Sequence, residues 1–301
     1  MVKIQEMGNE DNTNEELFGD IGSIAVDKNG WLYVADRAFN TIKKFDQDGK
    51  FIKKWGGTGS GPEEFSLLFR VLTDSKGNVF VLDSGNHKLA KFDPDGKFLK
   101  SIPIRINTGQ IRMTSDDKLF LLTWQPPQNT IEQFDNDLVF TGQLLEIKNN
   151  ANTFATYDFL IQPPWAICLD IINGKIQRYN WGSGTLVRED WVDNQEIVTE
   201  RMRRLKGKSN SPNSGMIWGL LSPFSSELYT LSFAFELDEK EDNKNKLIKK
   251  SFLYSMDGAY CGKLIIESGP EWYRDIFSFN EYIYTFDQTK IVKYKLLKSE
   301  K

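Results

Sequence analysis

The chain reads IGSIAVDKNGWLYVADRAFNTIKKFDQDGKFIKKW at residues 21–55 and LFRVLTDSKGNVFVLDSGNHKLAKFDPDGKFLKSI at residues 68–102, and these two stretches match. Each contains four short apolar or alternating runs, which in the first stretch are SIAVD, WLYVAD, TIKKFD and FIKKW. Alternation with a period of two predicts strands, and TIKKF and FIKKW are expected to keep one face in water. The Asp, Asn and Gly residues between the runs predict tight turns. Each stretch therefore predicts a unit of four strands.

The repeat continues in weaker form along the chain. The residues that we expect to end successive first strands are Asp27, Asp74, Thr114, Asp170, Ser222 and Ser278. Their spacing brackets the roughly 40–50 residues of a propeller blade. The predicted blades cover residues 21–56, 67–104, 108–148, 163–205, 214–267 and 272–298, and the N-terminal strand 2–6 completes the last blade. This pairing would close the ring and remove unpaired sheet edges. The sequence predicts an all-β fold, a six-bladed β-propeller with four-stranded antiparallel blades, as a single domain over residues 1–301.

Composition and charge exclude several classes of protein. Aromatic residues make up 13% of the chain, and no apolar run approaches the roughly 20 residues of a membrane helix, so we expect a soluble protein without a membrane span. A net charge of −4 argues against a nucleic-acid binder, and we interpret the basic run RMRRLKGK at residues 201–208 as a solvated edge. Cys168 and Cys261 are expected to be free thiols. We expect a monomer.

The N-terminal residues carry no secretory pattern, because Met1 is followed at once by the strand-like VKIQ. The compartment therefore stays open, and a periplasmic or extracellular place is compatible with a leader that has been removed. Two insertions, at residues 201–215 and 232–250, are interpreted as exposed loops.

The first two units resemble NHL repeats. The resemblance rests on YVADRAFNTIKKFDQDG, FVLDSGNHKLAKFDPDG and the linker WGGTGSGPEEF between them, and it covers about residues 20–105. It implies a six-bladed propeller but no single activity, because fold and function are separable. Amidating lyases on this fold use clusters of histidines, whereas this chain has one, His87.

Motifs that suggest a catalytic or metal site are better explained by the repeat. His87 lies in the turn between the second and third strands of its unit, and one histidine with two scattered cysteines makes a zinc site improbable. The DQDG and DPDG turns lack the remaining acidic positions of an EF-hand loop. GGTGSG at residues 56–61 lacks the lysine of a phosphate-binding loop. We predict no catalytic residues, no metal ligands and no cofactor.

Propeller geometry directs the search for a binding site to one end of the blades, where the first strands begin and the channel opens. The expected ligand-binding residues there are Phe69, Arg70, Gln110, Trp165, Trp218, Tyr273 and Arg274. Arginine can bind carboxylate or phosphate through two hydrogen bonds, and aromatic rings offer flat contact area. The competing interpretation is that the aromatic rings pack between blades and that the arginines pair with neighbouring acidic residues.

Two functional hypotheses from different classes remain. The first is a non-enzymatic binding or scaffold propeller that recognises a protein, a peptide or a small anionic ligand at the channel mouth. The alternative is a metal-assisted hydrolase of the gluconolactonase type, in which acidic and amide side chains hold a divalent cation in the channel. RNA binding, as in some tripartite-motif NHL proteins, is disfavoured by the net negative charge.

Overall fold

The computed structural model describes residues 2–8, 17–125, 128–148, 157–170, 175–191, 218–223, 228–237, 246–264 and 275–295. Contacts divide the chain into two compact units, Met1–Phe154 with Phe279–Lys301, and Ala155–Ser278. The described residues contain no helix that is long and apolar enough to cross a membrane.

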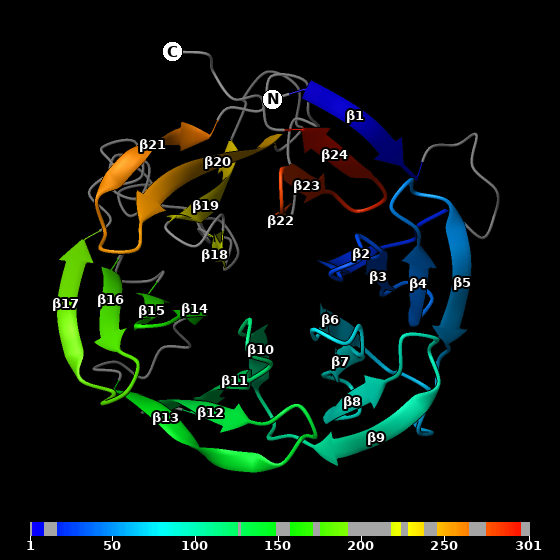
Figure 1. Cartoon of the computed structure of the whole chain (residues 1–301), viewed down its shortest axis with the longest axis horizontal. Coiled ribbons are helices and arrows are strands. Elements are labelled where there is room, and N and C mark those ends of the chain that lie inside the picture. Colours follow the sequence, from blue (N-terminus) through cyan, green and yellow to red (C-terminus); the bar gives the residue numbers. More distant parts are fainter. Residues whose placement is uncertain are drawn as a thin grey trace. The chain divides into compact units, whose positions relative to one another are not determined.

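The strands within these described residues form six four-stranded antiparallel sheets (Figure 1). Sheets 1 to 3 follow one another in the chain: sheet 1 consists of β2 (Ile21–Val26), β3 (Leu32–Asp36), β4 (Thr41–Phe45) and β5 (Phe51–Gly56), sheet 2 of β6 (Leu68–Thr73), β7 (Val79–Asp83), β8 (Lys88–Phe92) and β9 (Phe98–Pro103), and sheet 3 of β10 (Thr108–Met113), β11 (Leu119–Gln125), β12 (Gln128–Phe134) and β13 (Phe140–Lys148). The next two sheets belong to the second unit: sheet 4 consists of β14 (Tyr157–Gln162), β15 (Trp165–Asp170), β16 (Lys175–Asn180) and β17 (Leu186–Trp191), and sheet 5 of β18 (Trp218–Pro223), β19 (Leu228–Leu237), β20 (Lys246–Ser255) and β21 (Tyr260–Leu264).

Sheet 6 joins strands from the two ends of the chain. It consists of β22 (Asp275–Phe279), β23 (Tyr282–Phe286), β24 (Ile291–Lys295) and the N-terminal strand β1 (Val2–Met7). β1 pairs with β24 in the antiparallel sense, from Val2 opposite Lys295 to Met7 opposite Ile291. The predicted completion of the last sheet by the N-terminal strand is confirmed. The chain is an all-β propeller whose blades are four-stranded antiparallel sheets.

Neighbouring sheets in the first unit bury their faces against each other. One apolar cluster joins sheets 1 and 2, with Tyr33 and Ile42 on one side and Val71 and Phe92 on the other. A second cluster joins Phe80 and other side chains of sheet 2 to sheet 3. Because both faces of sheet 2 are covered, its middle strands β7 and β8 have no solvated face.

The third strands carry buried lysines, which alternation alone did not predict. Lys43 and Lys44 in β4 are 3% and 2% exposed, so the expected solvated face of TIKKF is wrong. The ammonium groups are accommodated because Lys43 pairs with Asp36 at 3.2 Å and Lys44 donates to the carbonyl of Pro94 at 2.6 Å. The outer strand FIKKW does alternate between half-buried and exposed residues, as predicted.

A lysine at the position of Lys44 links three pairs of consecutive sheets. Lys44 reaches the turn between β8 and β9 of sheet 2, and Lys91 of sheet 2 donates to the carbonyl of Asn136 in the turn between β12 and β13, at 2.5 Å. Lys293 of sheet 6 donates to the carbonyl of Gln47 in the turn between β4 and β5, at 3.0 Å. We call Lys44, Lys91 and Lys293 the inter-sheet lysines. Each donates a hydrogen bond to a hairpin turn of a neighbouring sheet.

The fourth sheet differs from the prediction by one strand. Trp165–Asp170 was expected to be a first strand, but β14 precedes it and pairs with it from Tyr157 opposite Asp170 to Gln162 opposite Trp165. WAICLD is therefore equivalent to LYVAD of sheet 1, and both strands end in aspartate. The error arose because a strand that ends in aspartate also occurs second in sheets 1 and 2, so the predicted blade at 163–205 begins too late.

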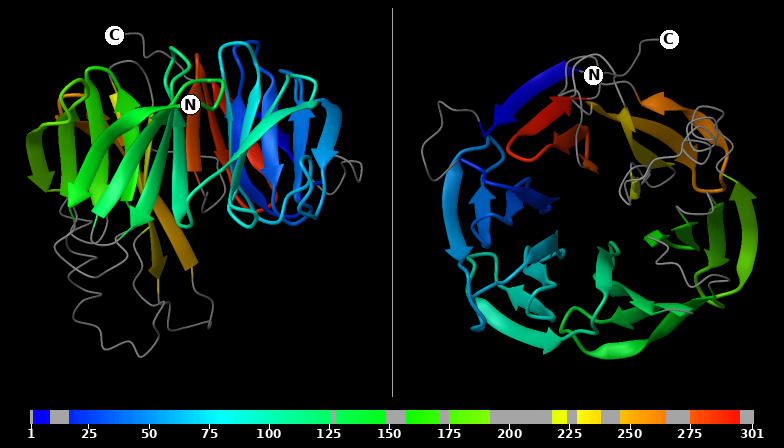
Figure 2. Two further views of the ribbon diagram at one scale, coloured as in Figure 1. Left: turned by 90° about the horizontal axis from the view of Figure 1, so that it is seen from below. Right: turned by 180° about the vertical axis from the view of Figure 1, so that it is seen from behind.

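A second correction concerns residues 232–250, which were interpreted as a loop. β19 and β20 pair over ten residues, from Leu228 opposite Ser255 to Leu237 opposite Lys246. They run past the ends of β18 and β21, as the yellow to orange strands of Figure 2 show. Most of the expected loop is thus a two-stranded ribbon. Residues 238–245 and the insertion at 201–215 lie outside the described residues.

Candidate functional site

The first strands of sheets 1 to 3 share an irregularity near their start. The pairing with the second strand shifts register between Ile21 and Ser23, between Leu68 and Arg70, and between Thr108 and Gln110. Gly22, Phe69 and Gly109 are the extra residues, and such bulges re-aim the side chains beside them. Ser23, Arg70 and Gln110 thereby occupy equivalent positions in three consecutive sheets.

Two of the predicted site residues meet directly. The Nε of Arg70 in β6 donates to the Oε1 of Gln110 in β10 at 3.1 Å. The Nη1 of Arg112, two residues further along β10, donates to the same oxygen at 3.4 Å and to the carbonyl of Ile111 at 3.0 Å. Gln110 is only 6% exposed, whereas both arginines are half-buried. The side-chain amide of Gln110 therefore orients two guanidinium groups from neighbouring sheets.

Phe69 forms the apolar border of this group. The Cζ of Arg70 lies 5.5 Å from the centre of the Phe69 ring, and the ring is half-buried. A guanidinium over an aromatic face is attracted by the ring and is held in one plane. The contact fixes the orientation of Arg70 from a second direction.

The corresponding position in sheet 1 is occupied by a residue without charge. The Oγ of Ser23 accepts a hydrogen bond from the backbone nitrogen of Val71 at 3.2 Å, and Ser23 is buried. Ser23 thus links sheets 1 and 2 but adds no charge, so the positive charge lies between sheets 2 and 3.

Sequence reasoning missed Arg112 and Trp124. Arg112 follows Gln110 by two residues on one strand, and residues with this spacing share a face, so the period of two could have identified it. Trp124 in β11 packs on Gly109, where an added Cβ would lie 2.0 Å from the indole ring. A side chain at residue 109 would require the indole ring of Trp124 to move. No signal in the sequence pairs this tryptophan with that glycine.

The remaining predicted site residues have different outcomes. Trp165 begins the second strand of sheet 4, beside the turn that ends β14, so its expected place at the start of a first strand is wrong. Trp218 begins β18, the first strand of sheet 5, as expected, and only its backbone is described. Tyr273 and Arg274 lie outside the described residues.

The carboxylates of the repeat's aspartates accept hydrogen bonds from backbone nitrogens. The Oδ1 of Asp46 accepts from the backbone nitrogens of Asp48 and Lys50 at 3.0 and 2.9 Å, and Asp93 does the same in sheet 2. Asp83, which is fully buried, accepts from the backbone nitrogens of Ser66 and Leu67 and so fixes the entry into β6. The interpretation of these acidic residues as architecture is confirmed.

The histidine turn and the glycine-rich segment also have structural places. His87 is exposed in the turn between β7 and β8, at a φ of 49°. The GGTGSG segment connects β5 to β6, and Lys88 donates to its Gly61 carbonyl at 2.6 Å. The backbone nitrogen of Gly61 donates to the carboxylate of Glu64 at 2.9 Å. The negative charge of Glu64 would repel a phosphate at this loop, and its carboxylate already occupies the Gly61 nitrogen.

Potential metal ligands and the two thiols can be placed in the described part of the chain. Its residues include no group of three or more His, Cys, Asp and Glu side chains that could hold a metal ion. Cys168 is buried and Cys261 is exposed, and both are free thiols. Burial, and secondarily the charge of Asp158, raises the pKa of the Cys168 thiol, which keeps this group protonated and unreactive.

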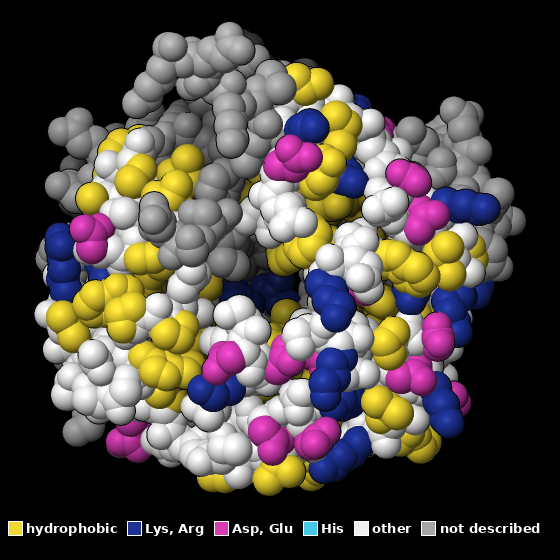
Figure 3. Space-filling view, viewed as in Figure 1, with side chains coloured by type: hydrophobic (Ala, Val, Ile, Leu, Met, Phe, Trp, Pro, Cys, Tyr) yellow, Lys and Arg dark blue, Asp and Glu magenta, His cyan; other side chains and the backbone are white. Residues whose placement is uncertain are grey.

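Basic side chains elsewhere on the surface are mixed with acidic ones. On the face shown in Figure 3, dark blue Lys and Arg side chains alternate with magenta Asp and Glu side chains over the described residues of the first unit. Such mixing leaves little long-range field on that face. The pair of guanidiniums at Gln110 is a local feature, and it suits a ligand that places one anionic group there.

Solved structures with the same architecture are distant in sequence. A protein from Bacteroides fragilis whose name describes it as exported is 14% identical, with a TM-score of 0.61 over 99% of this chain and 94% of that one. A member of the DUF4221 family from Bacteroides vulgatus is 12% identical, with a TM-score of 0.59 over 98% and 96%. Virginiamycin B lyase from Staphylococcus aureus is 15% identical, with a TM-score of 0.55 over 99% and 100%. At these identities the likeness shows the propeller fold alone.

No curated protein matches this chain. A family model described as a domain of unknown function, DUF4934, matches residues 11–190, which is more than half of the sequence. The chain belongs to the DUF4934 family.

Proposed function

We propose that this protein is a non-enzymatic binding propeller that recognises an anionic group of a small ligand, a peptide or a protein where the first strands of its sheets begin. The observation that carries the proposal is the single amide oxygen of Gln110, which accepts hydrogen bonds from Arg70 and Arg112. Two guanidiniums held side by side match the geometry of a carboxylate or phosphate.

Three features support recognition rather than catalysis. Guanidiniums stay protonated at all ordinary pH values, so they cannot act as general acids or bases. Gln110 and Phe69 are equally unsuited to proton transfer. Their arrangement does supply charge, a fixed plane and an apolar border, which are the elements of a binding site.

The proposed contact residues are Phe69, Arg70, Gln110 and Arg112. Trp218, Tyr273 and Arg274 remain candidates from the sequence alone: Trp218 begins β18, and Tyr273 and Arg274 precede β22 in the chain. Trp165 leaves it.

Titration with succinate tests the proposal, since succinate carries two carboxylates on a short chain, and succinamide is its neutral counterpart. We expect saturable heat of binding for succinate and at least about tenfold weaker binding for succinamide, because charge-assisted hydrogen bonds are about twice as strong as neutral ones. Replacing Arg70 by alanine should weaken succinate binding by about tenfold or more. Lys97→Ala, which removes the same charge from an exposed turn, is the matched control.

The outcome that would contradict the proposal is an equal affinity of wild-type protein, Arg70→Ala and Lys97→Ala for succinate. Absence of saturable succinate binding by the wild-type protein would also overturn it. The thermal midpoint of Arg70→Ala should stay within a few degrees of wild type, because a half-buried side chain at the sheet end contributes little to the core.

We further propose that the six sheets are the blades of one closed six-bladed ring of the NHL-repeat type. The proposal is supported by the matched first two units, by the inter-sheet lysines and by a sixth sheet that combines the N-terminal strand with the last three strands. A propeller that shares one sheet between its two chain ends leaves no edge strand there.

A further inference from the structure

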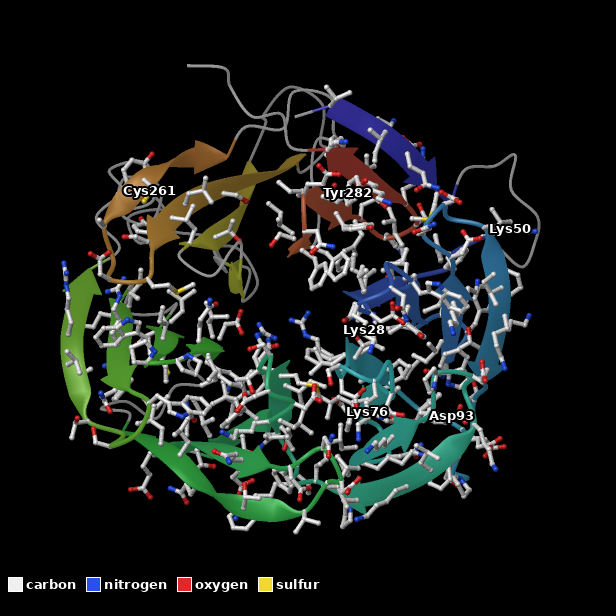
Figure 4. All side chains as sticks on the ribbon, in the orientation of Figure 1. Lys28, Lys50, Lys76, Asp93, Cys261 and Tyr282 are labelled. Atoms are coloured by element: carbon white, nitrogen blue, oxygen red, sulfur yellow. The ribbon has the colours of Figure 1, made fainter. Side chains whose placement is uncertain are left out.

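A cavity of about 360 Å³ lies between sheets 6 and 1 in the first unit. Its polar lining comes from Lys28, Asn29, Gln47, Asp48, Asn280 and Lys293. Lys28 lies in the turn that follows β2, whereas Ser23, Arg70 and Gln110 lie in the first halves of first strands. The cavity is thus at the other end of the sheets, and its size falls in the lower range of small-molecule pockets. Figure 4 labels Lys28 and Tyr282 on its two sides.

One wall repeats a motif of sheet 1. Lys293 stands opposite Tyr284 as Lys44 stands opposite Tyr33. Tyr282 lies two residues before Tyr284, as Trp31 lies two residues before Tyr33. The Nζ of Lys293 lies 4.4 Å from the ring centre of Tyr282 and 5.6 Å from that of Tyr284. Aromatic faces attract an ammonium and favour its charged form.

The ammonium of Lys293 has donor capacity beyond the contacts found within the described residues. It is 8% exposed and donates to one acceptor, the carbonyl of Gln47, whereas an ammonium has three N–H donors. Burial lowers the pKa of Lys293, and the nearby carboxylate of Asp48 opposes that shift. An anion in the cavity would compensate the buried charge, as buried charges require.

The charges of the lining set the valence of that anion. Lys28 and Lys293 are positive and Asp48 is negative, which leaves an excess of one positive charge. A monoanion balances this excess. A dianion such as phosphate would bring a second negative charge beside Asp48.

The other polar groups of the lining suit hydroxyl groups. The side-chain amides of Asn29, Gln47 and Asn280 each offer both donors and acceptors, and the rim residues Asn29 and Asn280 come from turns of two different sheets. Asn280 is held in its turn at a φ of 54°. Amides that point from fixed turns discriminate between hydroxylated and bare carbon chains.

We propose that this cavity binds a small hydroxylated monocarboxylate, with the carboxylate beside Lys28 and Lys293 and the hydroxyl groups on the amides of Asn29, Gln47 and Asn280. The site is separate from the arginine pair at Gln110 and does not depend on it.

Calorimetric titration with gluconate tests the proposal, with sorbitol as the neutral probe of the same chain length and inorganic phosphate as the dianion. Gluconate should bind saturably, and sorbitol and phosphate should bind at least about tenfold more weakly. Lys28→Ala should weaken gluconate binding by roughly fivefold, since this lysine is exposed and partly screened. Asp48→Asn keeps a residue that favours turns but removes the negative charge. This variant should bind gluconate more tightly and should bind phosphate measurably.

Lys76→Ala is the matched control, because Lys76 is an exposed lysine of the corresponding turn of sheet 2 (Figure 4). It should bind gluconate as the wild-type protein does. The proposal fails if wild-type protein does not bind gluconate, if phosphate binds as tightly as gluconate, or if Lys28→Ala and Asp48→Asn leave both affinities unchanged. If Arg70→Ala loses succinate binding but keeps gluconate binding, the two sites bind their ligands independently.

Discussion

Tyr284 is a buried residue whose hydroxyl links stability to pH. Burial, together with the neighbouring Tyr282, raises the pKa of Tyr284 to about 12, above the ordinary value of about 10. Between these values the unfolded chain loses the phenolic proton while the folded chain keeps it. Stability from this group is therefore fully present below pH ~10 and is lost as the pH rises through ~12.

Tyr284→Phe should accordingly reduce the loss of stability between about pH 10 and 12, by less than about 3 kcal/mol. Urea unfolding at a series of alkaline pH values measures it, with Tyr260→Phe at an exposed tyrosine as the control. An alkaline loss in Tyr284→Phe equal to that of the wild-type protein would show that this hydroxyl does not carry the dependence.

Turn residues could be predicted from the sequence because their contacts are local. The carboxylate of Asp46 binds nitrogens two and four residues ahead, so the motif contains its own partners. Gln110 and Arg70 were selected from their position in the repeat, but their contact spans 40 residues and has no local signal. The burial of Lys44 was missed for the same reason, since its acceptor at Pro94 belongs to another sheet.

At the scale of elements, the inter-sheet lysines explain how consecutive sheets hold one another. Lys44 donates to Pro94 and lies 3.8 Å from the ring centre of Trp31. Lys44→Met keeps the apolar stem but removes the donor and the charge. We expect the free energy of unfolding to fall by about 1–2 kcal/mol, because the lost hydrogen bond outweighs the relief of burying an ammonium.

The urea midpoint of Lys44→Met measures this effect, and Lys50→Met, at an exposed residue of a turn in the same sheet, is the matched control (Figure 4). A Lys44→Met protein as stable as Lys50→Met would mean that the lysine contact does not hold the sheets together.

The strands of sheets 1 to 3 could be predicted closely because alternation and turn residues agree there. Sheet 4 could not, because β14 and β15 form one apolar run, YDFLIQPPWAICLD, in which only the two prolines mark a turn. The ribbon of β19 and β20 was missed because its charged residues resemble those of a loop. Pairing between strands decides such segments, and a single sequence does not display it.

At the scale of the whole molecule, the proposed ring makes β1 essential. Deleting Val2–Met7 would turn β24 into an unpaired edge. In a closed cooperative ring we expect one thermal transition in both proteins and a midpoint lowered by more than about 5 °C in the deletion variant. Removing residues 296–301, which follow β24, is the control. Two separate transitions, with only one shifted by the deletion, would contradict the single closed ring.

In the proposed function, the guanidiniums of Arg70 and Arg112, which both donate to Gln110, bind an external anion. Gln110→Glu places a carboxylate where the amide oxygen now accepts both hydrogen bonds. The internal carboxylate should hold the two guanidiniums itself and neutralise one of their two positive charges, so the variant should stay folded while its donors are no longer available to an external anion.

Succinate titration of wild-type protein and Gln110→Glu, with thermal unfolding of both, is the most direct test. We expect the thermal midpoint of Gln110→Glu to lie no more than about 3 °C below that of the wild type, and its succinate binding to be at least about tenfold weaker. A folded Gln110→Glu protein that binds succinate as tightly as the wild type would contradict it.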